Sequence, residues 1–380
     1  MKRCKHPGEI IYLAALGIWL VLMILNLTYF REWVSIGTLS EIVQYTVLVL
    51  LLVKMSMEFK FSVRAVAELF VVLLMMFVGY SCGRLSFAVS LALVYSIKNV
   101  SFEKVLQLTF VIQAAFLIVT VTSSQLGIIE DYIWREELRE RHGLGYTHCL
   151  LGSHFVLFMS LILLAYFKKL KVWLALLIVL ANGLIYVYTD GRTNLMLAAG
   201  MILLACVAQL AEKYLKSSRV VALGAGIIPL AFGAAGVYAA SNFSFESPVW
   251  VRLNEILNMR IALMFWAWNE YGATWFGQRI KWIGASVLKD NPDLAYNYVD
   301  NAYVQAFFSY GTVFAVLLCL GWGIVLYRTM RKGQYVMASV ILVVLIHGLI
   351  NPQMIELAYN PFFLLLGTIN VPEKKITESA

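Results

Sequence analysis

Apolar positions along the chain recur in long uninterrupted runs, and short charged connections separate these runs. A run of about 20 apolar residues is long enough to form a helix that crosses the hydrocarbon core of a bilayer. The pattern predicts an all-α polytopic membrane protein with about twelve transmembrane helices, forming one integral domain over residues 1–380. The expected helices cover residues 9–30, 38–55, 64–80, 84–97, 104–123, 149–167, 172–189, 193–212, 220–240, 301–327, 335–350 and 356–370.

Two connections are longer than the others, residues 123–148 and residues 241–300. In the larger one, charged residues alternate with tryptophans, which suits segments that lie at the level of the lipid headgroups. We therefore expect amphipathic or re-entrant helices there, with Arg252 and Arg260 roughly on one helical face. The smaller one is expected to begin as a short charged helix that presents Arg135 and Arg139 on one face.

Composition supports a membrane protein, since 61% of the residues are hydrophobic and 14% are charged. A net charge of +8 is also found in nucleic-acid-binding proteins, but in a membrane protein the positive-inside rule explains it first. With both termini cytoplasmic, each cytoplasmic connection carries basic residues. The first apolar run has no cleavage site after it and is expected to act as a signal anchor.

The basic residues on the opposite, external side are mostly arginine, whereas those on the cytoplasmic side are mostly lysine. Positive charge alone sets topology, so this preference needs another reason, and a guanidinium group matches phosphate oxygens. The alternative is that these arginines pair with external acids or reach toward headgroups. The external set is Arg31, Arg84, Arg135, Arg139, Arg141, Arg192, Arg252, Arg260, Arg279, Lys281 and Lys289.

Within this set, Arg192, Arg260 and Arg279 are the main candidates for binding a diphosphate, with Arg141 and Arg252 as secondary candidates. Arg192 lies in a tight turn between two helices, where an ionisable residue is costly and therefore a functional candidate, and Asp190 is placed to orient it.

Three residues are candidates for a general base: His148, Asp300 and Glu356. His148 and Asp300 also have a structural interpretation. A histidine at a helix mouth is often only hydrogen-bonded, and Asp300 is well placed to cap the helix that follows it. His154 is deeper in an apolar run and is interpreted as a core residue.

The chain lacks a Walker A sequence, an HExxH sequence and a D-x-D pair, so neither a divalent metal nor another cofactor is expected. The cysteines show no metal-ligand spacing. Buried free thiols are favoured over a disulfide between Cys82 and Cys149.

Taken together, these stretches resemble the bacterial Wzy family, the repeat-unit polymerases of O-antigen, capsule and exopolysaccharide, and more loosely the O-antigen ligases. The layout is similar too, with one enlarged external loop before the third-last helix. The stretches are RHGLGYTH (141–148), TDGRTN (189–194), the Arg252 and Arg260 segment followed by WFGQR, VDNAYVQAFFSYG (299–311) and residues 356–360.

The resemblance implies a metal-independent glycosyltransferase of the GT-C type in the bacterial cytoplasmic membrane, with its active site facing outside. Such an enzyme transfers a growing glycan from undecaprenyl diphosphate to another lipid-linked repeat unit. Membrane lipid, a chain-length regulator and a flippase would be its partners. Two alternatives stay open: a ligase-like glycan transferase, and a flippase or transporter of lipid-linked oligosaccharide.

Overall fold

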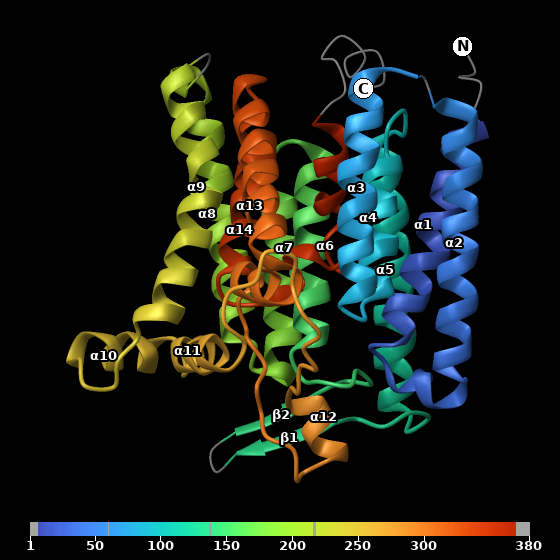
Figure 1. Cartoon of the computed structure of the whole chain (residues 1–380). Helices are drawn as coiled ribbons and strands as arrows, with labels where there is room; N and C mark the ends of the chain where they lie inside the picture. Colours follow the sequence, from blue (N-terminus) through green and yellow to red (C-terminus); the bar gives the residue numbers. More distant parts are fainter. Residues whose placement is uncertain (1–6, 60, 137–138, 216–217, 370–380) are drawn as a thin grey trace.

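Helices form almost all of the regular structure in the computed structural model, which describes residues 7–59, 61–136, 139–215 and 218–369. The long helices run side by side in one bundle (Figure 1). Among the described residues, 7 helices are long and apolar enough to cross a membrane, which supports a polytopic membrane protein. They are α1 (Pro7–Leu25), α2 (Ile36–Glu58), α5 (Phe102–Gln125), α7 (Val172–Thr189), α8 (Arg192–Leu215), α9 (Arg219–Asn242) and α13 (Ala302–Arg331). Shorter apolar helices accompany them: α3 (Val63–Ser81), α4 (Leu85–Ser96), α6 (Leu151–Phe167) and α14 (Tyr335–Gly348).

Each helix expected from 9–30 to 335–350 has a counterpart in the bundle, and the bounds differ by a few residues. The expected helix over 356–370 is wrong. The chain forms two 3₁₀ helices there, η2 (Pro352–Ile355) and η3 (Pro361–Thr368), with extended backbone at Glu356 between them. Proline supplies no N–H donor and clashes with the preceding turn, so prolines at the start of both elements prevent one continuous α-helix. The two chain ends, expected to be cytoplasmic, lie outside the described residues.

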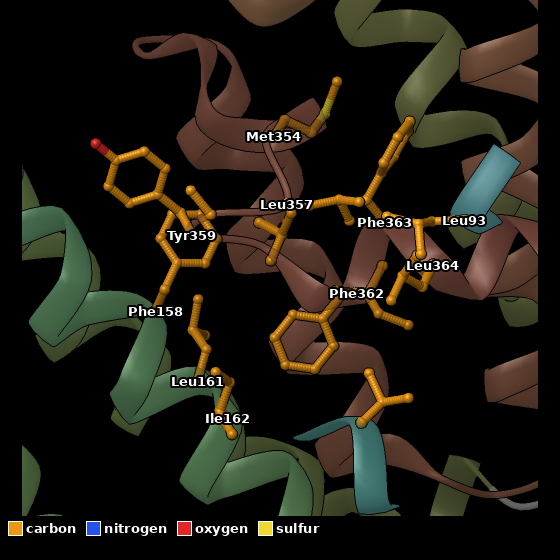
Figure 2. Packing of buried hydrophobic residues seen from close by; sticks show 14 of the residues in the cluster. Leu93, Phe158, Leu161, Ile162, Met354, Leu357, Tyr359, Phe362, Phe363 and Leu364 are labelled. Atoms are coloured by element: carbon orange, nitrogen blue, oxygen red, sulfur yellow. The ribbon is translucent and has the colours of Figure 1, made fainter. Parts of the chain in front are cut away.

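This irregular segment packs in the middle of the bundle. Figure 2 shows its apolar side chains between α6 and α4. The side chains in contact there are buried and belong to the largest apolar cluster: Leu93, Phe158, Leu161, Ile162, Met354, Leu357, Tyr359, Phe362, Phe363 and Leu364. Burial in protein is what allows irregular backbone inside a membrane bundle, because lipid cannot supply hydrogen bonds.

Side chains of two polar residues supply those hydrogen bonds. Gln113 of α5 donates from Nε2 to the carbonyl oxygens of Ala358 and Tyr359, at 2.7 and 3.0 Å. Asn360 donates from Nδ2 to Met354 O at 2.6 Å and accepts from Phe362 N at 3.1 Å. Polar residues in the apolar interior therefore replace the bonds that a regular helix would have made.

One end of the bundle carries the extra structure, and we call it the hairpin end (Figure 1). An antiparallel hairpin of β1 (Ile133–Glu136) and β2 (Arg139–His142) lies there, with α12 (Ala285–Asp290) near it. Helices α10 (Pro248–Ile256) and α11 (Arg260–Tyr271) lie across the bundle axis, as expected for the long connection between α9 and α13. A short 3₁₀ helix, η1 (Tyr29–Trp33), follows α1.

The segment over residues 272–284, which we call the strap, runs from α11 against α13. Gly311 interrupts α13 with φ of 85°, and Thr312 N donates to Thr274 O of the strap at 2.8 Å. A Cβ at Gly311 would lie 2.4 Å from Gly277 N, so only glycine allows this approach. The strap is thereby fixed to the bundle by backbone contacts.

Candidate functional site

A cavity of about 150 Å³ lies at the hairpin end, and arginine dominates its wall. The arginines come from three separate connections of the chain: between α5 and α6, between α7 and α8, and between α9 and α13. We call it the arginine cavity. It is lined by Arg139, Arg141, Leu150, His154, Asp190, Gly191, Arg192, Thr193, Asn194, Asn258, Arg260 and Asn351.

Strand β2 supplies two of these arginines. Arg139 and Arg141 are two residues apart, and in a strand such residues point to the same face. Both approach Asp190 Oδ2 with Nε, at 3.4 and 3.9 Å. The helix expected here is wrong, because the charges follow the two-residue period of a hairpin. Arg135 is exposed and pairs across the hairpin with Glu140 at 3.5 Å.

Asp131 fixes the hairpin to the loop that leads into α6. Its Oδ2 lies 2.6 Å from His142 Nδ1, and its Oδ1 accepts from Leu144 N at 2.7 Å. Leu144 has a left-handed backbone with φ of 53°. One carboxylate therefore holds both the end of β2 and the turn after it, and so sets where Arg139 and Arg141 lie.

The helices α6, α8 and α11 begin at the arginine cavity. Helix α8 starts at Arg192 after a turn in which Asp190 has φ of 44°. Helix α11 starts at Arg260 after two left-handed residues, Asn258 and Met259, so Arg252 and Arg260 do not share one helix as expected. Leu150, just before α6, lines the cavity. The first N–H groups of a helix lack partners and carry partial positive charge, so these ends add to the attraction for an anion.

Asp190 is the carboxylate among the lining residues. Arg192 Nε donates to Asp190 Oδ1 at 3.1 Å, consistent with the expected orienting role. Burial opposes ionisation of Asp190, but the hydrogen bond from Arg192 and the charges of Arg192 and Arg139 outweigh it, so its pKa lies below the usual value. One carboxylate facing several guanidinium groups leaves the cavity with excess positive charge.

Two of the guanidinium groups have unused donors. The Nε atoms of Arg141 and Arg260 are buried without a hydrogen-bond partner in the described residues. Arg260 Nε lies 3.8 Å from Asp300 Oδ2, and its NH1 donates weakly to Leu257 O at 3.4 Å. A buried donor without a partner costs free energy, which a bound acceptor would recover.

Two predicted diphosphate-binding residues lie elsewhere. Arg252 is exposed on α10 and pairs with Glu255 at 3.0 Å. Arg279 is exposed on the strap and donates from Nε to Ser81 O at 2.9 Å, at the end of α3. Neither lines the arginine cavity, because α10 projects from the bundle and the strap runs toward the α3–α4 turn.

The three candidate bases have different surroundings. Asp300 contacts Arg260, and burial raises its pKa against the opposing charge of that arginine. The expected cap of α13 is provided instead by Asn301, whose Oδ1 accepts from Val304 N at 3.0 Å. Asp300 therefore does not cap α13.

None of the three candidate bases lines the cavity itself, but Asp300 contacts the lining residue Arg260. Burial and the charge of Arg141 lower the pKa of His148 to about 4, and its Nδ1 accepts from Leu150 N at 3.2 Å. His148 is therefore neutral near neutral pH. Glu356 lies in the connection between η2 and η3, inside the bundle.

The sequence interpretation missed several lining residues: His154, Asn194, Asn258 and Asn351. His154 is 3% exposed, as a core residue would be, but it also lines the cavity. One signal was available, since Asn194 is two residues after Arg192 in the TDGRTN turn. Asn258 and Asn351 lie at helix ends, and no local sequence pattern indicates that these ends face the cavity.

Other features bear on the predicted chemistry. The described residues contain no group of three or more His, Cys, Asp or Glu placed to hold a metal ion. Cys82 and Cys149 are buried and do not form a disulfide. A larger cavity of about 1050 Å³ lies at the opposite end of the bundle, where lysines and glutamates mix and Lys168 pairs with Glu103 at 2.7 Å. Its mixed charge does not favour an anion as the arginine cavity does.

No protein-family model, curated protein or solved structure matches this chain.

Proposed function

We propose that this chain is a metal-independent glycosyltransferase that polymerises polysaccharide repeat units at the outer face of the bacterial cytoplasmic membrane. The donor would be a glycan on undecaprenyl diphosphate and the acceptor another lipid-linked repeat unit. One observation carries the proposal: Arg139, Arg141, Arg192 and Arg260, from three separate connections, line one cavity.

The chemistry explains why such a cavity would be needed. The acceptor hydroxyl oxygen attacks the anomeric carbon of the donor sugar, and the bond from that carbon to the diphosphate oxygen breaks. The electron pair stays on the diphosphate, so negative charge develops there. Fixed guanidinium groups and helix N-termini stabilise developing charge without reorganising, and in a water-poor site this effect is large.

The hydroxyl proton must go to a base, and Asp300 is the strongest candidate among the three predicted residues. Its carboxylate lies 3.8 Å from Arg260 Nε, so it is adjacent to the leaving-group site. Burial raises its pKa, which makes the carboxylate a better proton acceptor. In this scheme Arg260 would bind the diphosphate and also orient the base.

Topology supports the same placement. The hairpin end holds the arginine cavity, whereas the opposite end carries clusters of basic residues at the turns between α6 and α7 and between α13 and α14. By the positive-inside rule the end with these clusters would be cytoplasmic and the cavity external. A lipid-linked substrate would then approach from the outer leaflet.

The test is complementation of a deletion strain with Arg192→Ala, Arg260→Ala and Arg252→Ala, with glycan length read on a gel and lipid-linked intermediates analysed in parallel. Arg252→Ala is the matched control, an arginine in the same connection that lies outside the cavity. We expect single repeat units with the first two variants, normal polymer with the control, and equal protein levels in the membrane.

Other outcomes would replace the proposal. Full-length lipid-linked glycan in the deletion strain would indicate a ligase, and repeat units trapped on the cytoplasmic side would indicate a flippase. Normal chain length with both Arg192→Ala and Arg260→Ala would remove the role proposed for the arginine cavity.

A further inference from the structure

A chain of buried polar groups lies directly behind the arginine cavity, where the sequence suggests only core. His154 of α6 is its centre. Its Nδ1 lies 3.0 Å from Asn194 Nδ2 of α8 and 3.2 Å from His347 Nε2 of α14. Asn194 Nδ2 also donates to Ser153 Oγ at 2.7 Å. His154, Asn194, Ser153 and His347 are each at most 3% exposed, so the geometry of this chain is set by protein groups alone.

The proton positions in this group of residues follow from the Asn194 amide nitrogen, which can only donate. It donates one hydrogen to Ser153 Oγ at 2.7 Å, and the hydroxyl of Ser153 donates in turn to the carbonyl oxygen of Leu150 at 2.8 Å. The second hydrogen of the amide nitrogen goes to His154 Nδ1 at 3.0 Å. That nitrogen is bare, and the proton of the neutral His154 ring is on Nε2. His347 Nε2 faces the same bare nitrogen and must carry a hydrogen too.

Of the two histidines in this group, His154 has the ring donor, Nε2–H, that makes no hydrogen bond to a described residue. His154 lines the arginine cavity together with Arg141, Arg192 and Arg260. We propose, on the basis of the proposed function, that His154 is a further diphosphate-binding residue that donates a neutral hydrogen bond from Nε2. Asn194 and His347 are positioning residues that fix this tautomer.

The assignment has a chemical consequence for specificity. A ring whose free nitrogen carries a hydrogen cannot accept the proton of a sugar hydroxyl, so His154 is not the general base. It adds a fixed donor to a wall that already consists of guanidinium groups and helix N-termini. A phosphate oxygen, which is an acceptor only, fits this wall better than a sugar hydroxyl does.

The test uses the full-length protein in lipid nanodiscs and inorganic diphosphate as the probe, with affinity measured by calorimetry. His154→Leu removes the donor, and His154→Gln returns an N–H at about the same distance from the backbone. A hydrogen bond to a charged group contributes about 1.5–3 kcal/mol, so we expect His154→Leu to weaken binding by about tenfold or more. His154→Gln should stay within about threefold of the wild type. Thermal unfolding of each variant controls for loss of the fold.

A second measurement does not depend on variants. Nitrogen-15 spectra of histidine-labelled wild-type protein should show His154 protonated at Nε2 and bare at Nδ1, and its Nε2 signal should move on addition of diphosphate. The opposite tautomer, or a signal that ignores diphosphate, would overturn the inference even if the variants fail to fold.

The outcomes separate this inference from the proposed function. Diphosphate binding that is lost in Arg192→Ala but unchanged in His154→Leu would reject the role of His154 and leave the arginine cavity intact. A wild-type protein that does not bind diphosphate would instead contradict both.

Discussion

Arg260 and Arg279 belong to the same connection and are equally good phosphate-binding candidates in the sequence, but the fold gives them different surroundings. Arg260 begins α11, lines a cavity with three other arginines and has a buried Nε without a hydrogen-bond partner. Arg279 lies exposed on the strap, and its Nε donates to a backbone carbonyl of α3. The comparison shows that two arginines of one connection differ in their free donors, and this difference makes Arg260, and not Arg279, the candidate for binding a ligand.

The most direct test of this difference is to remove the guanidinium group of Arg260 and that of Arg279 in separate variants. Arg260→Ala should slow glycan transfer by about 10²–10³-fold, the usual effect of removing one group that stabilises developing charge. Arg279→Ala should leave the transfer rate within about threefold and instead lower thermal stability slightly. Rates would be measured on purified protein with lipid-linked repeat units. Equal losses in the two variants would show that the strap also contributes to the site.

A second prediction tests the proposed general base, Asp300, which lies next to Arg260. Asp300→Asn should lower the transfer rate by about 10²-fold or more, because general-base catalysis typically contributes that much. A base must be ionised, so the wild-type rate should fall as pH drops below the raised pKa of Asp300. The pH–rate profile checks this directly. A profile that Asp300→Asn leaves unchanged in shape would transfer the role to another residue.

A third prediction tests whether the hairpin positions the two arginines of β2 in the cavity. Asp131→Ala removes the acceptor for His142 and Leu144 N, so β2 should no longer hold Arg139 and Arg141 in place. We expect diphosphate affinity to fall by about threefold, less than the tenfold or more expected for a lining residue, because the arginines themselves remain. Glu255→Gln, an exposed acid on α10, is the control. Unchanged affinity in Asp131→Ala would show that the hairpin positions neither arginine.

The sequence predicts the bundle well and the site only in part, for physical reasons. Apolar runs fix where α1 to α9, α13 and α14 lie, since each such run must be helical in a membrane. The segment with the two 3₁₀ helices could not be predicted in this way. Its backbone hydrogen bonds come from the side chains of Gln113 and Asn360, and no periodic sequence pattern indicates such bonds.

Predictions of site residues are wrong where the sequence does not reveal the strand periodicity or a contact between distant parts of the chain. Arg139 and Arg141 share a face only when the segment is a strand, and their charges alone do not reveal the two-residue period. Arg252 and Arg260 are separated because Asn258 and Met259 adopt left-handed backbone, which sequence spacing does not show. Arg279 is fixed by Ser81, nearly two hundred residues away in the chain, and no local pattern encodes that contact.

The measurement that bears most directly on the arginine cavity is equilibrium binding of inorganic diphosphate to wild-type protein, Arg192→Ala, Arg260→Ala and Arg279→Ala in nanodiscs. We predict that Arg192→Ala and Arg260→Ala each weaken binding by about tenfold or more and that Arg279→Ala stays within about twofold. Binding that depends on Arg279 as strongly as on Arg260, or on neither Arg192 nor Arg260, would contradict a diphosphate site in this cavity.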